Sequence, residues 1–317
     1  MTRFASLALA ALAAFCAAHA AAAPFAYVSN EGSGTISVVD IATDKVTATL
    51  KVGTKPRGIA VSRDGSRLYV SDQTGGAIVV HDLARDANIA TIPVGKSPEA
   101  VYLSPDGRSI SVAVEENDQV AIVDLATLKV VRSIRTRGKN PEHAVWSPDG
   151  KWLYASAEEA DSVDVIDAAK GEVVRSITVG QRPRGIGFLP DGSRAYVAAE
   201  QADRVNVIDT ARGEVVATIA VGLRSNGVLV HPDGKHVFVT SGGKGTVQVI
   251  DTASRAIVAE VEVGKRPWNM ALSPDGRKLY VACGRSNAVA VVDATSFTKT
   301  GEIAVGNLPW GVAIPAR

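Results

Sequence analysis

The chain repeats itself, and the length of the repeat limits its possible folds more than any other feature does. An apolar stretch that ends in aspartate occurs seven times, at intervals of 42 residues with one interval of 43: Asp40, Asp82, Asp124, Asp167, Asp209, Asp251 and Asp293. A glycine followed by two residues, usually both polar, and then usually by a proline recurs in step with it, at Gly53, Gly95, Gly138, Gly180, Gly222, Gly264 and Gly306. Sevenfold recurrence at this period is typical of a repeat architecture.

Each unit holds four short runs of β-branched residues separated by turn residues, which is the pattern of strands. A Ser-Pro-Asp-Gly segment such as Ser104 to Gly107 predicts a hairpin reversal, because proline presets φ for a type I turn. The recurrent Asp is interpreted as structural, since it can accept a hydrogen bond from the backbone two residues on. No segment shows apolar residues at helical spacing. The pattern therefore predicts an all-β, seven-bladed β-propeller of four-stranded antiparallel blades, with most stability coming from burial between blades.

The two ends of the chain predict how the ring closes. The segment from Phe25 to Ser29 has the pattern of a second strand, and the segment from Trp310 to Ile314 that of a lone first strand. Pairing them in one blade would leave no sheet edge at the join. We therefore expect a single propeller domain over residues 24–317.

Residues 1–23 have a different composition from the rest. A basic start at Arg3 precedes an apolar, alanine-rich run and the small residues around Ala20. This pattern predicts a cleaved signal peptide, and hence a periplasmic or secreted protein without a membrane span. Cys16 lies within that run, so the processed chain would keep only Cys283 and form no disulfide within itself.

The charge balance argues against one class of partner. The chain has 34 Lys and Arg against 33 Asp and Glu. A protein that binds chiefly by neutralising phosphates should carry more basic residues, so nucleic acid is not an expected partner. We expect a monomer, and no residue pattern identifies a cofactor.

Three segments carry a family resemblance: Tyr27 to Asn30, Tyr69 to Asp72 and Tyr280 to Cys283. Together with the Val-Gly-x-x-Pro and Ser-Pro-Asp-Gly elements, they resemble the YVTN family of β-propeller repeats over nearly all of the chain beyond residue 23. Ser111 and Ser225 depart from the family pattern. The two Pro-Trp pairs, which end at Trp268 and Trp310, are similar to those of propellers associated with pyrroloquinoline-quinone-dependent alcohol catabolism. That resemblance implies a redox enzyme or a transport component as partner.

In a repeat protein, function is expected where the copies disagree. The residue after the proline position should lie at one mouth of the central channel, and there the seven copies have Arg57, Glu99, Glu142, Arg184, Asn226, Trp268 and Trp310. With His143, these residues are our candidate site for a small ligand or a protein partner, with the tryptophans as a flat apolar wall. In the alternative, the tryptophans plug the channel and the charges pair with each other.

Three functions remain open. The first is a non-catalytic binding or scaffold protein, because the chain shows no haem-attachment motif, phosphate loop or nucleophile elbow. The resemblance implies that such a protein would be accessory to quinone-dependent alcohol oxidation. The second is a lactonase-like or lyase-like enzyme with a site that spans blades; Glu142, His143 and Glu99 could assemble a metal site there. The third is a quinoprotein or haem-binding subunit.

Overall fold

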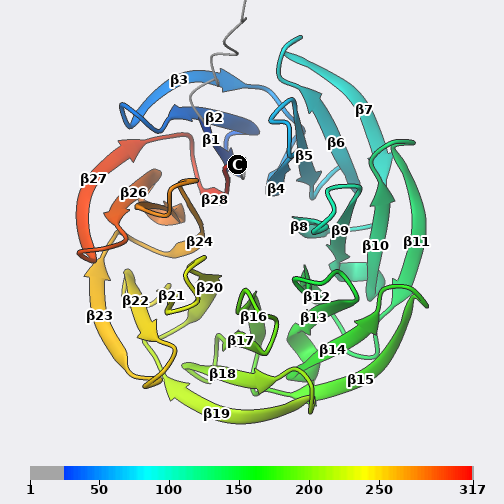
Figure 1. Ribbon diagram of the computed structural model, residues 1–317. Coiled ribbons are helices and arrows are strands. Elements are labelled where there is room, and N and C mark those ends of the chain that lie inside the picture. Colours follow the sequence, from blue (N-terminus) through cyan, green and yellow to red (C-terminus); the bar gives the residue numbers. More distant parts are fainter. Residues whose placement is uncertain (1–24, 316–317) are drawn as a thin grey trace, which may run out of the picture.

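The computed structural model describes residues 25–315 and shows seven sheets of four strands each. Figure 1 shows the sheets arranged as a ring, with one strand of each sheet nearest the axis and one on the perimeter. Neighbouring strands within every sheet are antiparallel, which confirms the predicted seven-bladed propeller. The predicted signal peptide, residues 1–23, lies outside the described residues.

We number the blades along the chain, and each blade except the last is built from four consecutive strands. Blade 1 contains β4 (Pro56–Val61), β5 (Arg67–Asp72), β6 (Ala77–Asp82) and β7 (Ala87–Pro93). Blade 2 contains β8 (Pro98–Leu103), β9 (Ser109–Val114), β10 (Gln119–Asp124) and β11 (Lys129–Arg135). Blade 3 contains β12 (Pro141–Trp146), β13 (Trp152–Ala157), β14 (Ser162–Asp167) and β15 (Glu172–Thr178).

Blades 4 to 6 follow the same plan. Blade 4 contains β16 (Pro183–Phe188), β17 (Arg194–Ala199), β18 (Arg204–Asp209) and β19 (Glu214–Ala220). Blade 5 contains β20 (Ser225–Val230), β21 (His236–Ser241), β22 (Thr246–Asp251) and β23 (Ile257–Glu262). Blade 6 contains β24 (Pro267–Leu272), β25 (Lys278–Cys283), β26 (Ala288–Asp293) and β27 (Thr298–Ala304).

Blade 7 joins the two ends of the chain. It consists of β28 (Pro309–Ala313), β1 (Phe25–Asn30), β2 (Thr35–Asp40) and β3 (Lys45–Leu50), in that order. Strand β28 pairs antiparallel with β1, with Val312 opposite Val28. Figure 1 shows β28 beside β1, so the ring closes as the sequence predicts.

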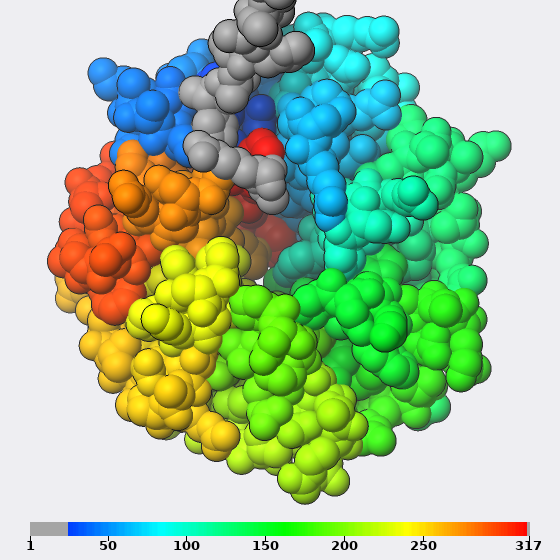
Figure 2. Space-filling model, in the orientation of Figure 1, coloured from blue at the N-terminus to red at the C-terminus, as the bar shows by residue number. Residues whose placement is uncertain are grey.

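The hydrophobic core lies between blades. The buried residues form seven clusters, and each cluster combines side chains of two neighbouring blades. One cluster, for example, joins Ile78 of blade 1 to Val112 of blade 2, both fully buried. Figure 2 shows the blades packed side by side around a central depression. Burial between neighbours therefore holds the ring together, as expected for a repeat protein.

The repeated turns have the roles that the sequence predicts. Asp40 accepts hydrogen bonds from the backbone N–H groups of Ala42 (2.7 Å) and Thr43 (3.2 Å), and in the other blades the equivalent Asp residues accept from the N–H three residues on and, at Asp82 and Asp293, also from the one two residues on. Three short 3₁₀ turns cover Glu115–Asn117, Glu158–Ala160 and Gly284–Ser286. Cys283 is buried in a core cluster, and burial raises its thiol pKa to about 12. Within residues 25–315, no helix is long and apolar enough to cross a membrane.

Candidate functional site

The seven predicted mouth residues all occupy the second position of an innermost strand, at the same end of the ring. Their prolines or, in blade 5, Ser225 begin the strands. The turns between second and third strands share this face, since Glu158 forms an ion pair with Arg182 in the loop before β16. The geometry of the mouth is therefore the one that the repeat register predicts.

Hydroxyl groups of the second strands fix the backbone at the mouth. Ser71 donates a hydrogen bond to the carbonyl of Glu99 in the next blade (2.7 Å), and Thr240 donates to the carbonyl of Trp268 (2.8 Å). Adjacent innermost strands approach so closely there that a Cβ on Gly58 would lie 2.3 Å from the Glu99 carbonyl oxygen. Glycine is needed at such a contact because any side chain would push the strands apart.

Blades 7, 1 and 2 contribute the first charged cluster. The Arg57 guanidinium lies 2.6 Å from both oxygens of Glu99, whose side chain is fully buried. Glu31 joins the cluster, with Oε1 lying 3.3 Å from Arg57 and 3.1 Å from Lys55. Gln73 also donates to Glu99 (2.7 Å). The mouth thus holds charged groups that have lost most of their water and depend on each other.

Arg184 organises the second cluster, on blades 3, 4 and 6. Its guanidinium forms ion pairs with Glu142, with Glu158 (3.1 Å) and with Glu200 (2.8 Å). Glu200 also accepts a hydrogen bond from Arg266 (2.7 Å), two blades away. Charge-assisted pairs of this kind are strong only when their hydrogen bonds are satisfied, which ties the position of each group to the others.

The proximity of these glutamates separates their pKa values. Burial alone would raise the pKa of Glu142, but the charge of Arg184 outweighs it and lowers that pKa to about 2. Burial, and the hydrogen bond to Glu142, raise the pKa of Glu158 to about 8. Burial and the charge of Glu142 also raise the pKa of Glu99, in spite of its contact with Arg57. The same geometry therefore favours the ionised form of Glu142 and disfavours that of Glu158.

His143 lies under the mouth, at a position where blades 1, 4, 5 and 7 have glycine. It is 1% exposed, and burial lowers its pKa to about 4, so the imidazole is neutral. Its Nδ1 shares a hydrogen bond with the hydroxyl of Tyr102 (2.6 Å). The Trp310 ring, from blade 7, stacks on it with 6.3 Å between ring centroids. Trp310 and His143 therefore meet across the channel.

These contacts show which predicted residues come together. The charged residues pair with each other, and Trp310 reaches across the channel, as the alternative of a plugged channel expects. Trp268 packs edge-on against Trp310 (6.4 Å), whereas Asn226 makes no hydrogen bond with the other candidate residues in the described part of the chain. The prediction that the rim binds a ligand or partner stays a prediction.

Four participants were not predicted: Glu31, Gln73, Glu200 and Tyr102. A signal for the first three exists in the repeat, because each of them directly follows a second strand, at the register position of Glu115 and Glu158. The contact of Tyr102 with His143 has no comparable signal, since it depends on the rotation of neighbouring blades.

Two cavities adjoin the mouth. The larger, of about 730 Å³, lies between the loops of blades 1 and 2 and is lined by Gln73, Ser97 and Glu115 among others. Ser97 links it to the first cluster by donating to Glu115 (2.8 Å) and to Glu99 (3.3 Å). The smaller lies on the axis below Trp310 and measures only about 100 Å³. Small-molecule sites have volumes of about 300–1,000 Å³, so only the first has the size for a ligand.

Within residues 25–315, the carboxylates of Glu115, Glu142 and Glu158 converge, with one oxygen of each lying within 4.8 Å of the others. This grouping differs from the predicted combination of Glu142 with His143 and Glu99, because His143 bonds to Tyr102 instead. Arg184 already neutralises part of the cluster.

Comparison with known families places the chain. The model of the cytochrome D1 heme domain family matches residues 8–189, more than half of the 317 residues. The chain belongs to this family. A second model, of the seven-bladed β-propeller lactonases, matches residues 167–305. No curated protein matches the chain.

Solved structures agree on the fold. A chain of hydrazine synthase from Kuenenia stuttgartiensis is 28% identical, with a TM-score of 0.78 over 85% of this chain and 92% of that one. A protein of unknown function from Desulfotomaculum acetoxidans DSM 771 and a proposed 6-phosphogluconolactonase from Bacteroides uniformis ATCC 8492 are each 20% identical. Their TM-scores are 0.82 and 0.78, and each match covers 92% of this chain and 99% of the other.

The two cavities at the mouth do not fit the haem that the family description names. The axial cavity of about 100 Å³ is too small for a macrocycle, because Trp310 and Tyr102 fill the space near His143. The cavity between blades 1 and 2 is large enough, but its lining contains no His, Met, Cys or Tyr to bind the iron. Family membership is therefore matched by the fold, and neither mouth cavity of the described residues is a haem site.

Proposed function

We propose that the protein is an exported, non-catalytic propeller that binds a redox enzyme through its channel-mouth face. Export rests on the signal pattern of residues 1–23. The redox association is supported by the cytochrome D1 heme domain family and by the similarity to hydrazine synthase. The sequence resemblance suggests that this redox enzyme takes part in quinone-dependent alcohol oxidation and that the propeller is accessory to it.

One observation carries the proposal: large apolar side chains are exposed on the mouth face of blades 5 to 7. Leu223 is 56% exposed and Leu308 is 38% exposed, both in loops that lead into innermost strands. The half-buried Trp268 lies on the blade between them, with the Arg266 guanidinium 6.0 Å from its ring. Tryptophan and arginine among exposed leucines are typical of the centre of a protein interface.

The charged half of the face completes this surface. Lys55 and Arg182 are 39% and 37% exposed at the edges of the two clusters. A partner that contacts both halves would need an apolar segment flanked by charged side chains. Such charges set the orientation of a complex more than its affinity.

The direct test is capture of the partner from periplasmic extract with a tagged protein. The double variant Leu223→Glu and Leu308→Glu should lose at least 90% of the captured redox enzyme, because it places two charges in the apolar centre. Val258→Glu is the matched control, since Val258 is 51% exposed on the outer strand β23, away from the mouth. Equal capture by the double variant and the wild type would refute the proposal, as would recovery of no redox enzyme by the wild type.

A lactonase is the second candidate, and a specific observation favours it. The stretch matched by the lactonase family model, residues 167–305, contains Arg184 and Arg266, which both form ion pairs with Glu200 at the mouth. Two guanidinium groups around a carboxylate could hold the carboxylate that lactone opening produces. Acid release from δ-valerolactone, measured at constant pH, tests this candidate. Hydrolysis that Arg266→Gln abolishes would support it, and wild-type hydrolysis no faster than buffer would exclude it for this substrate.

A further inference from the structure

We propose that the face opposite to the channel mouth carries a binding site for neutral oligosaccharides, centred on Trp152 of blade 3. The site is independent of the proposed partner surface, because it lies where the first strands end and the Ser-Pro-Asp-Gly turns begin. It rests on an exposed indole, on cavities at both sides of that indole, and on the polar groups that line them.

Trp152 departs from the repeat. At its position, the first residue of the second strand, the other blades have Arg67, Ser109, Arg194, His236, Lys278 and Phe25. The Trp152 side chain is 37% exposed, although an indole buries a large apolar area when it packs into a core. Its backbone N–H donates to Ser147 Oγ (3.0 Å), which fixes the start of β13 on the turn. A tryptophan therefore occupies a position at which the fold accepts residues of very different kinds.

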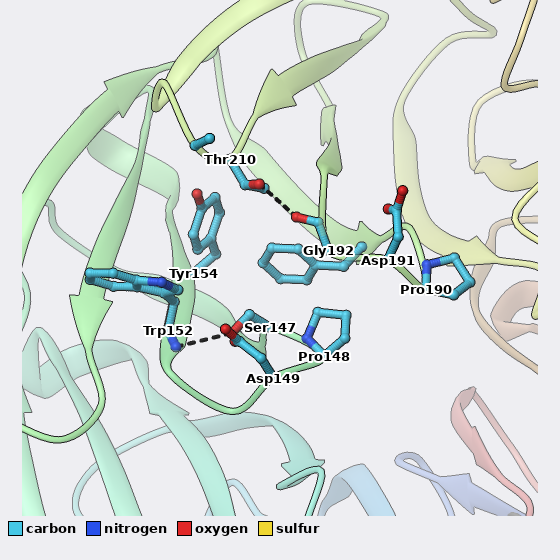
Figure 3. Close-up of a pocket in the computed structure, with 11 residues that line it drawn as sticks. Ser147, Pro148, Asp149, Trp152, Tyr154, Pro190, Asp191, Gly192 and Thr210 are labelled. Atoms are coloured by element: carbon cyan, nitrogen blue, oxygen red, sulfur yellow. Dashed lines mark hydrogen bonds between the residues drawn. The ribbon is translucent and has the colours of Figure 1, made fainter.

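The first cavity, of about 410 Å³, lies between blades 3 and 4. Figure 3 shows Trp152 and Tyr154 on one side and Pro190, Asp191 and Gly192 on the other. The Tyr154 ring is held by Phe188, with 4.9 Å between ring centroids in an edge-to-face arrangement. The lining contains no Lys, Arg or His. Apolar rings and acceptor oxygens therefore share one hollow of ligand size.

A second cavity, of about 540 Å³, lies on the other side of Trp152, between blades 2 and 3. Its lining adds Trp146, which also borders a third cavity of about 380 Å³ beside the turn of blade 2. Val131, 59% exposed, contributes further apolar surface. The indole of Trp152 consequently stands between two hollows, so an extended ligand can contact it while it occupies both.

The polar groups indicate what kind of ligand fits. Asp149 and Asp191 each use Oδ1 to accept hydrogen bonds from their own turns. The second oxygen of Asp191 bonds to no other described residue, and that of Asp149 lies 3.5 Å from the exposed Lys151 Nζ. Hydrogen bonds from Ser147 and from Ser193 lower the pKa of the two carboxyls, so both are ionised acceptors.

The second cavity supplies charges of both signs. Its lining contains Arg132, Lys151 and Asp167, so the combined surface has no strong net charge. A charged ligand would meet a group of its own sign in one of the two cavities. A neutral sugar chain meets this chemistry, because its C–H faces stack on indole and its hydroxyls both donate and accept hydrogen bonds.

The test is binding to an array of neutral hexose and N-acetylhexosamine oligosaccharides of two to eight units. The wild type should retain at least one series, with affinity that rises with chain length, and Trp152→Ala should bind it at least tenfold more weakly. Arg67→Ala is the matched control, because it truncates the equivalent position of blade 1, and it should bind like the wild type. Trp152→Phe should recover part of the affinity, and a thermal melt of each variant separates lost binding from lost folding.

Two results would overturn the proposal: no oligosaccharide retained by the folded wild type, or equal binding by folded Trp152→Ala. Binding of acidic oligosaccharides alone would also contradict it, because the argument requires a neutral ligand. None of these results bears on the partner surface, which is tested with different variants and a different readout.

Discussion

Carboxylates occur in two settings in this propeller, and they serve opposite purposes. The seven Asp residues that end the third strands lie at the surface, and their oxygens accept hydrogen bonds from turn backbone. The glutamates of the mouth, such as Glu99 and Glu142, are buried and depend on arginines of other blades. The carboxylates that recur in every blade therefore stabilise a turn within that blade, whereas the carboxylates that do not recur connect different blades.

The difference in energy is the main consequence. An exposed carboxylate that accepts backbone hydrogen bonds contributes modestly and loses little water. A buried ion pair gives up its hydration and is often no more stable than an apolar pair of the same volume. Blades 5 to 7 have Asn226, Trp268 and Trp310 at the same position, so the propeller closes without a charge there. We infer that the mouth charges are retained for binding.

The largest effect is expected when one arginine is removed from the mouth. Arg184→Leu leaves Glu142, Glu158 and Glu200 with less positive charge in a buried site, and should lower the free energy of unfolding by about 3–5 kcal/mol. Urea unfolding at pH 7 measures it, with Arg184→Lys as a control that keeps the charge and should lose less. A loss below 1 kcal/mol for Arg184→Leu would show that the cluster is not buried as described.

A pH dependence should come from His143. Burial lowers its pKa from 6.5 to about 4 in the folded protein, so the unfolded chain binds the proton first as the pH falls. The stability that depends on the neutral imidazole is fully present above pH 6.5. As the pH falls from 6.5 to 4, the free energy of unfolding decreases by up to about 3 kcal/mol. His143→Gln keeps an acceptor for Tyr102 and should remove this part of the slope. Identical pH profiles for the variant and the wild type would contradict a neutral, buried imidazole.

A repeated carboxylate should matter less. Asp40→Ala removes the acceptor of two backbone N–H groups at the edge of blade 7 and should cost about 1 kcal/mol. Asp40→Asn keeps an acceptor and should cost less. Thermal unfolding of both variants would sharpen the comparison, and a loss for Asp40→Ala as large as that for Arg184→Leu would remove the distinction between the two settings.

The fold could be predicted from the sequence because the same pattern of strands and turns occurs in seven copies. The Asp and Gly markers fixed the blade number, and the patterns around Phe25 and Trp310 fixed the closure. The mouth positions followed from the same register. The partners of each mouth residue did not, because Arg184 reaches Glu200 and Arg266 reaches the same carboxylate through side-chain conformations that no spacing encodes.

The contact of His143 with Trp310 is a second example of a contact that the sequence pattern does not predict. The two residues come from blades 3 and 7, and they meet only because the channel is narrow enough for one indole to span it. Channel width depends on how tightly seven interfaces pack, and the glycines at Gly58, Gly185 and Gly227 allow the innermost strands to approach closely. A sequence pattern identifies the glycines, but the distance across the ring follows from the sum of the interfaces.

The inference that the buried mouth charges do not serve stability can be tested by the unfolding free energy of Arg57→Met, of Glu99→Met and of the two combined. We expect each single change to lower stability by about 3 kcal/mol or more, because it leaves the other side chain buried without its partner, and the double variant to lie within about 1 kcal/mol of the wild type. A double variant that loses as much as the two single variants together would contradict the claim and would make the pair a structural element of the ring.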